Sequence, residues 1–202
     1  MDFRTQVLAA EATSRQAADA LLLLIVGDRL PANLDAPLHQ AVKDAVALGD
    51  FAFKPGQAAY LRQVAGVKAQ RVTVVAAKDG SAKAVRAAAL AGIGQIKSLG
   101  VKGAAVLIAG ADAVTAALAE AVASAAAEAL YTYRTTKPSA PAASALSKLT
   151  LLVAKSDQKA ADAGLALGAA IADGVDLARE LANRPGNHCT PTLLANEARK
   201  MA

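Results

Sequence analysis

Four short apolar runs, separated by stretches with helical spacing, constrain the fold of this chain more than any other feature. The runs are Ala20–Val26, Arg71–Ala77, Ala104–Ala109 and Leu149–Ala154. The β-branched residues of the second run favour a strand. Strands that alternate with helices are typical of a mostly parallel sheet joined by right-handed crossovers. The chain is therefore expected to form an α/β layered sandwich.

The segments between the runs predict the helices of this sandwich. Apolar residues recur every three or four positions over residues 38–46, and Gly49 is placed to end that helix. Ser81 is positioned to cap the next helix, and Asp112 to cap an Ala-rich helix that continues to about Tyr133. The Pro-, Ser- and Ala-rich stretch Thr135–Ser144 is expected to be a loop.

A long helix is expected to begin at Ser156-Asp157, after the last apolar run. Its apolar residues recur at helical spacing and predict the face that it buries. These residues are Leu167, Ile171, Val175, Ala178 and Ala182.

The composition supports a folded core. Hydrophobic residues make up 54% of the chain and charged residues 19%, which excludes a disordered tail. Aromatic residues are only 3% and Trp is absent, so the core must consist of Ala, Val, Leu and Ile. A length of 202 residues fits one domain, or one domain and part of another.

The chain carries a net charge of +5, from 22 basic and 17 acidic residues. This charge attracts polyanions and leaves DNA open as a partner. The basic residues are scattered, which favours an ordinary solvated surface over a binding patch. Examples are Lys43, Lys54, Arg62, Lys68, Arg71, Lys78, Lys83 and Arg86.

The remaining compositional signals indicate a soluble cytoplasmic protein. The single cysteine, Cys189, excludes an internal disulfide framework and fits a reducing compartment. Residues 1–6 show no apolar segment behind a basic start, so no secretory signal is visible. The apolar run Leu21–Val26 is far shorter than the roughly 20 residues of a membrane helix.

Two short motifs invite a chemical interpretation. Gly92-Ile-Gly94 resembles part of a dinucleotide-binding loop, but both glycines fall inside a helical pattern and Lys97 stands where a third glycine is needed. We interpret them as a place where helix and sheet approach closely. His188-Cys189 has only His39 as a further His or Cys, too few for a zinc site, and adjacent residues seldom form a catalytic pair.

The closing stretch, Asn183–Ala195, predicts a rigid connection between two helices. Pro185 pushes Arg184 out of the helical conformation and so ends the long helix. Thr190 is a good N-cap, and Pro191 is favoured at the first helical position. The amides of Asn183 and Asn187 can satisfy free backbone groups of the loop.

The same stretch resembles the domain-junction signature of the leucyl (cytosol) aminopeptidase family. The matching residues are Asn183, Pro185, Asn187, Thr190, Pro191, Leu194 and Ala195. Upstream segments agree in order: Gly49-Asp50-Phe51, Lys54-Pro-Gly56, Leu61-Arg62, Gly66-Val67-Lys68, Arg71–Ala77, Lys97-Ser-Leu-Gly-Val-Lys102 and Tyr133-Arg134. The resemblance covers nearly the whole chain and is strongest from about residue 165.

This resemblance implies three parts. Residues 1–154 correspond to an N-terminal α/β domain similar to a macro domain, and residues 155–184 to a long linker helix. Residues 185–202 correspond to the junction loop and the first helix of a catalytic domain. The family implies a cytoplasmic metalloprotease, an aminopeptidase that uses two Mn or Zn ions, assembles as a homohexamer and releases N-terminal residues from peptides.

The resemblance also implies that this chain is inactive by itself. The family carries its metal ligands and catalytic groups in an Asp-(Ser/Thr)-Gly-Gly region and an Asn-Thr-Asp-Ala-Glu-Gly-Arg motif, and neither occurs in residues 1–202. No catalytic, cofactor-binding or metal-binding residue can therefore be assigned. A scaffold that positions subunits is the preferred role for the chain. The alternatives are a DNA-binding module, as in some relatives, or a module that binds an ADP-ribose-type ligand.

Overall fold

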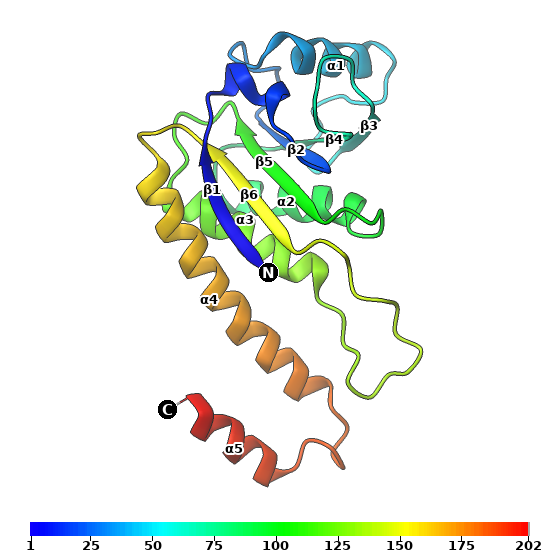
Figure 1. Ribbon diagram of the computed structural model, residues 1–202, viewed down its shortest axis with the longest axis vertical. Helices are drawn as coiled ribbons and strands as arrows, with labels where there is room; N and C mark the ends of the chain where they lie inside the picture. Colours follow the sequence, from blue (N-terminus) through cyan, green and yellow to red (C-terminus); the bar gives the residue numbers. More distant parts are fainter. Residues whose placement is uncertain (202) are drawn as a thin grey trace.

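Six strands form one sheet in the computed structural model, which describes residues 1–201 (Figure 1). The strand order is β1-β6-β5-β2-β4-β3. Every neighbouring pair is parallel except β3 and β4. The expected α/β sandwich with a mostly parallel sheet is confirmed. The strands are β1 (Asp2–Val7), β2 (Ala20–Val26), β3 (Ala58–Arg62), β4 (Arg71–Ala77), β5 (Gly103–Ala109) and β6 (Lys148–Val153).

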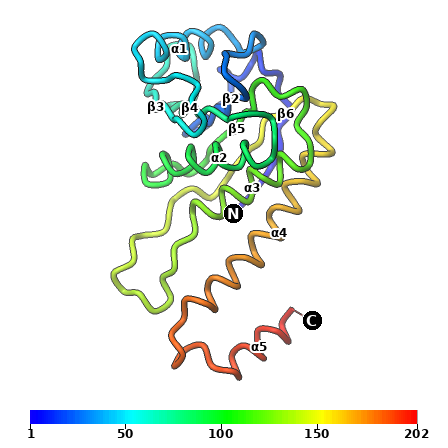
Figure 2. Tube along the Cα trace, turned by 180° about the vertical axis from the view of Figure 1, so that it is seen from behind, coloured from blue at the N-terminus to red at the C-terminus, as the bar shows by residue number. Residues whose placement is uncertain are grey.

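Helices cover both faces of the sheet (Figure 2). The helices α2, α3 and α4 share one hydrophobic core with one face of the sheet, and α1 packs on the other face near the 3₁₀ helix η1. Their bounds are η1 (Ala10–Arg15), α1 (Ala36–Ala47), α2 (Ala82–Ile96), α3 (Ala116–Leu130), α4 (Gln158–Asn183) and α5 (Pro191–Met201). No helix in residues 1–201 is both long enough and apolar enough to cross a membrane.

The central strand β2 explains why the apolar runs are continuous. It lies between β4 and β5, and its residues 20–25 are completely buried. Leu22 and Leu24 point into the core under α2 and α3, whereas Leu21 and Leu23 point into the core under α1. A parallel strand covered on both faces has no solvent side, so it contains no polar alternation.

The expected start and end of α3 are wrong. The helix begins at Ala116 rather than after Asp112, because the Thr115 hydroxyl accepts the Leu118 N–H at 3.3 Å and caps it. The carboxylate of Asp157 accepts the Val114 N–H at 2.8 Å and holds the preceding segment outside the helix. The helix ends at Leu130, since the backbone angles of the next residue, Tyr131, are no longer helical, with φ −59° and ψ 130°.

The expected buried face of α4 is also wrong. Leu167, Ile171 and Val175 are 56%, 42% and 41% exposed. The helix instead buries a neighbouring face of small residues and one leucine, which lies against α3. A Cβ on Gly164 would stand 2.1 Å from the Ala116 carbonyl oxygen, so the two helices approach too closely for larger side chains. The buried residues are Ala161, Gly164, Leu165, Gly168 and Ala172.

Candidate interdomain site at the end of α4

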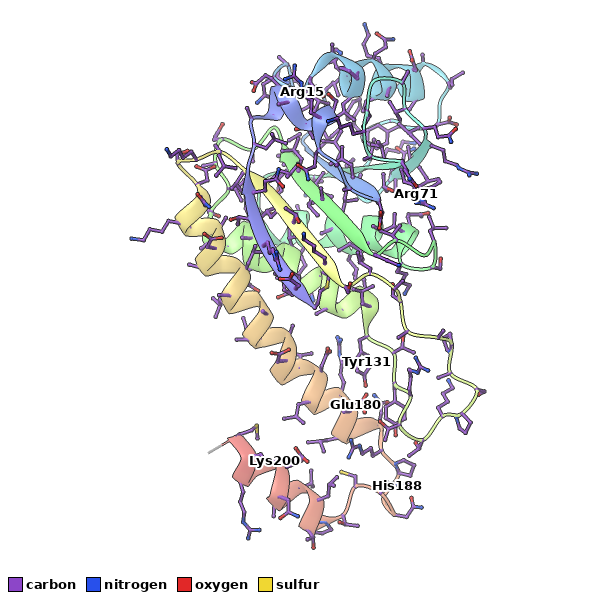
Figure 3. All side chains as sticks on the ribbon, viewed as in Figure 1. Arg15, Arg71, Tyr131, Glu180, His188 and Lys200 are labelled. Atoms are coloured by element: carbon purple, nitrogen blue, oxygen red, sulfur yellow. The ribbon has the colours of Figure 1, made fainter. Side chains whose placement is uncertain are left out.

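The second half of α4 leaves the α/β layers and leads to the junction and α5 (Figures 1 and 3). Beyond Ala172, none of the residues of α4 is buried, and α5 buries none of its residues 191–201. The part of the chain that resembles a domain junction therefore projects away from the sheet. Functional contacts of this region must come from its exposed side chains.

A hydrogen-bond network around Tyr131 ties this projecting end to the rest of the molecule. Tyr131 follows the last residue of α3, and its hydroxyl donates to the Glu180 carboxylate at 3.3 Å. The other oxygen of Glu180 accepts the hydroxyl of Thr135 at 2.7 Å. The Asn183 amide donates to the Tyr131 hydroxyl at 3.3 Å and to the Arg179 carbonyl at 2.9 Å. Figure 3 shows Tyr131 and Glu180 beside each other.

The electrostatics of the network keep Tyr131 protonated. Burial raises the pKa of the Tyr131 hydroxyl, the hydrogen bond from Asn183 lowers it, and the charge of Glu180 raises it further. A neutral hydroxyl can donate to the carboxylate, as the geometry requires. The guanidinium of Arg179 lies 5.2 Å from the centre of the Tyr131 ring, a cation–π distance.

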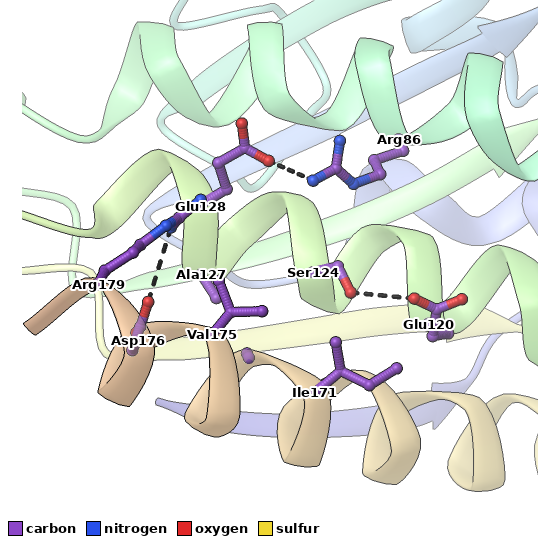
Figure 4. A pocket seen from close by; sticks show the side chains of 10 residues that line it. Arg86, Glu120, Ser124, Ala127, Glu128, Ile171, Val175, Asp176 and Arg179 are labelled. Atoms are coloured by element: carbon purple, nitrogen blue, oxygen red, sulfur yellow. Dashed lines mark hydrogen bonds and ion pairs between the residues drawn. The ribbon is translucent and has the colours of Figure 1, made fainter. Parts of the chain in front are cut away.

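A groove of about 190 Å³ lies between α4 and the outer side of α3 (Figure 4). Its apolar part comes from Ala127 on α3 and from Ile171 and Val175 on α4. Its charged rim includes an ion pair between Arg86 and Glu128. The Ser124 hydroxyl donates to the Glu120 carboxylate at 3.0 Å in this groove, and no His or Cys lines it among residues 1–201.

One carboxylate of the groove has a perturbed ionisation. Burial raises the pKa of Asp176, the nearby charge of Arg179 opposes this effect, and the negative charges of Asp173 and Glu180 add to it. The Arg179 guanidinium approaches Asp176 only to 3.7 Å. A weakly paired carboxylate at the rim is a candidate contact for a partner's basic or hydroxyl group.

The junction itself is a short turn between two helix ends. Arg184 has extended backbone angles before Pro185, whose carbonyl accepts the N–H groups of His188 at 2.8 Å and Cys189 at 2.9 Å. The Thr190 hydroxyl accepts the Leu193 N–H at 3.3 Å, and α5 begins at Pro191. The Asn183 amide does not serve the loop backbone as expected.

The chemical motifs of the sequence lie elsewhere. Gly92 sits inside α2 with its Cα close to Leu22, and an added Cβ would meet the Leu22 Cδ1 at 2.2 Å. This contact confirms the packing interpretation for Gly92, but the interpretation is wrong for Gly94, where an added Cβ would meet nothing within 4 Å. His188 is exposed and Cys189 partly exposed, at the outer turn of the junction. In residues 1–201 there is no group of three His, Cys, Asp or Glu side chains placed to hold a metal ion.

A second cavity lies at the carboxyl ends of β5 and β6, where sheets of this type bind ligands. Its volume is about 270 Å³, and it is lined by the acidic residues Glu11, Asp112 and Asp157. None of its lining residues within the described chain is Lys or Arg. Three carboxylates without a basic partner repel a diphosphate, so this cavity does not favour an ADP-ribose-type ligand.

Comparison with known proteins gives a consistent result. The sequence model described as "Cytosol aminopeptidase family, N-terminal domain" matches residues 10–140. A probable cytosol aminopeptidase of Methylibium petroleiphilum is 54% identical over 202 residues, which are 100% of this chain and 41% of that protein. A probable cytosol aminopeptidase of Polaromonas naphthalenivorans is 39% identical over 207 residues, covering 100% of this chain and 39% of that protein.

Two solved structures share the fold. A tomato leucine aminopeptidase mutant superposes with a TM-score of 0.77 at 23% identity, over 100% of this chain and 42% of that one. The bottromycin maturation enzyme BotP superposes with a TM-score of 0.66 at 24% identity, over 92% of this chain and 37% of that one. The chain thus spans about two fifths of the length of the proteins that it matches.

Proposed function

The chain belongs to the cytosol aminopeptidase family, and from this membership we propose that it is the N-terminal, non-catalytic region of a metal-dependent aminopeptidase. Its role is to act as a scaffold that holds and orients a catalytic domain. The observation that carries the proposal is the 54% identity over the whole chain to a relative of which it spans only 41%.

The proposed division follows the family signature. Residues 1–154 form the α/β domain, residues 155–184 the linker helix, and residues 185–202 the junction and the start of the catalytic domain. The bounds of α4 (Gln158–Asn183) and α5 (Pro191–Met201) support this division. The similarity of the first part to a macro domain stays a prediction.

The exposed apolar side chains support a role in contact with a further domain. A helix as short as α5 is marginal in water unless it packs against something, because isolated helices below about 12 residues are barely stable. Its Leu194 and Met201 are 45% and 69% exposed. On α4, Leu167 and Ile171 are exposed as well. We infer that the catalytic domain covers these side chains.

The activity, cofactors and assembly belong to the same proposal. The catalytic domain is proposed to bind two Mn or Zn ions and to release N-terminal residues from peptides in the cytoplasm, in a homohexamer. None of its metal-binding groups is assigned to this chain. A scaffold role is preferred over DNA binding, because the basic residues are dispersed along the sequence and few aromatic side chains are available for base stacking.

The chain alone is expected to be catalytically silent. It lacks both motifs in which the family carries its metal and catalytic groups, so added Mn²⁺ or Zn²⁺ has no site at which to activate water. The measurement is hydrolysis of leucine p-nitroanilide by the purified chain, with far-UV circular dichroism to establish that it is folded. Metal-dependent release of nitroaniline above the blank contradicts the proposal.

A further inference from the structure

The direction of α4 is fixed in two different ways along its length. Its first half packs closely against α3, and the last residue that it buries is Ala172. The part from there to Asn183 extends for about 16 Å at the usual rise of an α-helix. None of its residues is fully buried, so hydrophobic packing within residues 1–201 holds it less firmly than the first half.

The side-chain hydrogen bonds that connect this second half to the rest of residues 1–201 all involve Glu180 or Asn183. Glu180 binds two separate points, since one oxygen accepts from Tyr131 at the end of α3 and the other from Thr135 in the following loop. A carboxylate held at both oxygens restricts the helix more than a single contact does. Tyr131 completes the arrangement by accepting from Asn183.

We propose that Tyr131, Thr135 and Glu180 form an orientation latch, which sets the direction of the end of α4 and thereby the position of α5. That the latch orients a catalytic domain rests on the proposed function. The latch itself does not, because all of its groups and the helix that it directs lie in this chain. Tyr131 and Glu180 are thus positioning residues with no part in the chemistry.

The latch lies where a small change in the direction of α4 moves α5 the most. Glu180 lies two turns beyond the last buried residue of α4 and one turn before the junction. Without these hydrogen bonds, the end of α4 is free to tilt relative to its packed half. The resulting displacement increases from Glu180 toward α5. Because the packed half is untouched, the fold is expected to keep its stability while α5 samples more positions.

The test measures the distance between α5 and the body of the domain. Cys189 is the only cysteine of the chain and lies just before α5, so a spin label attached there reports on the junction. A second label is introduced by Leu48→Cys, at a side chain that is 77% exposed after α1. Pulsed electron spin resonance then gives the distribution of distances between the two labels.

Tyr131→Phe removes the hydroxyl and keeps the ring under Arg179. We expect it to broaden the distance distribution by about twofold while the melting temperature changes by no more than a few degrees, as for an exposed contact. Glu180→Ala also removes the hydrogen bond from Thr135 and is expected to broaden the distribution at least as much. Glu128→Gln is the matched control, since it breaks the Arg86–Glu128 ion pair of the same groove without touching the latch. It should leave the distribution unchanged.

Distributions for Tyr131→Phe and Glu180→Ala that coincide with the control overturn the latch. This outcome is independent of the assay of the chain alone, because hydrolysis by the chain contradicts the proposed function and leaves the distance measurement as it is. Equal broadening by the control Glu128→Gln would mean that any change in the groove loosens the helix, and this result also overturns the latch.

Discussion

Replacing Gly164 with alanine is expected to lower the free energy of unfolding by about 2 kcal/mol or more, which is the upper part of the range for overpacked sites. The new Cβ would stand 2.1 Å from the carbonyl oxygen of Ala116 and 2.8 Å from its carbonyl carbon. These are backbone atoms, so no side-chain rotation relieves the contact and α4 must move away from α3. The gain from alanine in a helix, up to about 1 kcal/mol, offsets only part of this cost. Urea denaturation gives the value.

Gly174→Ala is the matched control on the same helix. A Cβ there meets nothing within 4 Å, so the substitution adds helix propensity alone and should stabilise the chain by about 0.5–1 kcal/mol. Opposite signs for the two variants support the close approach of α3 and α4. If Gly164→Ala stabilises the chain as Gly174→Ala does, the packing of these two helices is described wrongly.

Replacing Gly92 with alanine is expected to have the second large effect, a decrease of about 1–3 kcal/mol in the free energy of unfolding. A Cβ on Gly92 would meet the Leu22 Cδ1 at 2.2 Å and the Val75 Cγ2 at 3.0 Å. Both contacts are side chains and can shift, but Leu22 and Val75 are completely buried, so the surrounding core must rearrange. Thermal unfolding followed by circular dichroism measures the change.

The second glycine of the motif provides the control. Gly94 has nothing within 4 Å of an added Cβ, and Gly94→Ala is expected to stabilise α2 by up to about 1 kcal/mol. Equal destabilisation by the two substitutions would contradict the packing interpretation of Gly92, because only Gly92 lies against the core.

The sheet could be predicted from the sequence because its central strands are buried on both faces. Continuous apolar runs mark β2, β4, β5 and β6. The edge strand β1 carries polar residues such as Arg4 and Gln6 on its exposed positions and gives no such run. Only its pairing with β6 makes it a strand.

The helix surfaces were harder to predict for a physical reason. In α3 nine of the fifteen positions are alanine, so hydrophobicity does not mark where the helix starts. The start is decided by which side chain reaches the free N–H groups, and that side chain is Thr115 and not Asp112. In α4 the close contact with α3 requires glycine. A prediction that places the most hydrophobic residues of α4 in the core therefore chooses Ile171 and Val175, which are exposed in the structure.

The latch could not be found in the sequence. Tyr131 and Glu180 are separated by 49 positions, and neither belongs to a motif with fixed spacing. Their meeting depends on where α3 ends and on the angle at which α4 passes it. Thr190 and Pro191, by contrast, act on the nearest backbone, and local sequence is enough to place α5 after them.

The central claim is that this chain is the N-terminal region of a cytosol aminopeptidase, and one chimera tests it directly. The chain replaces the matching 41% of the Methylibium petroleiphilum relative and is joined to the rest of that protein. Hydrolysis of leucine p-nitroanilide is measured with added Mn²⁺, and gel filtration compares the assembly of the chimera with that of the intact relative. The account predicts activity in the chimera, at a level comparable with the relative. A chimera that folds and assembles as the relative does, yet hydrolyses nothing, contradicts it.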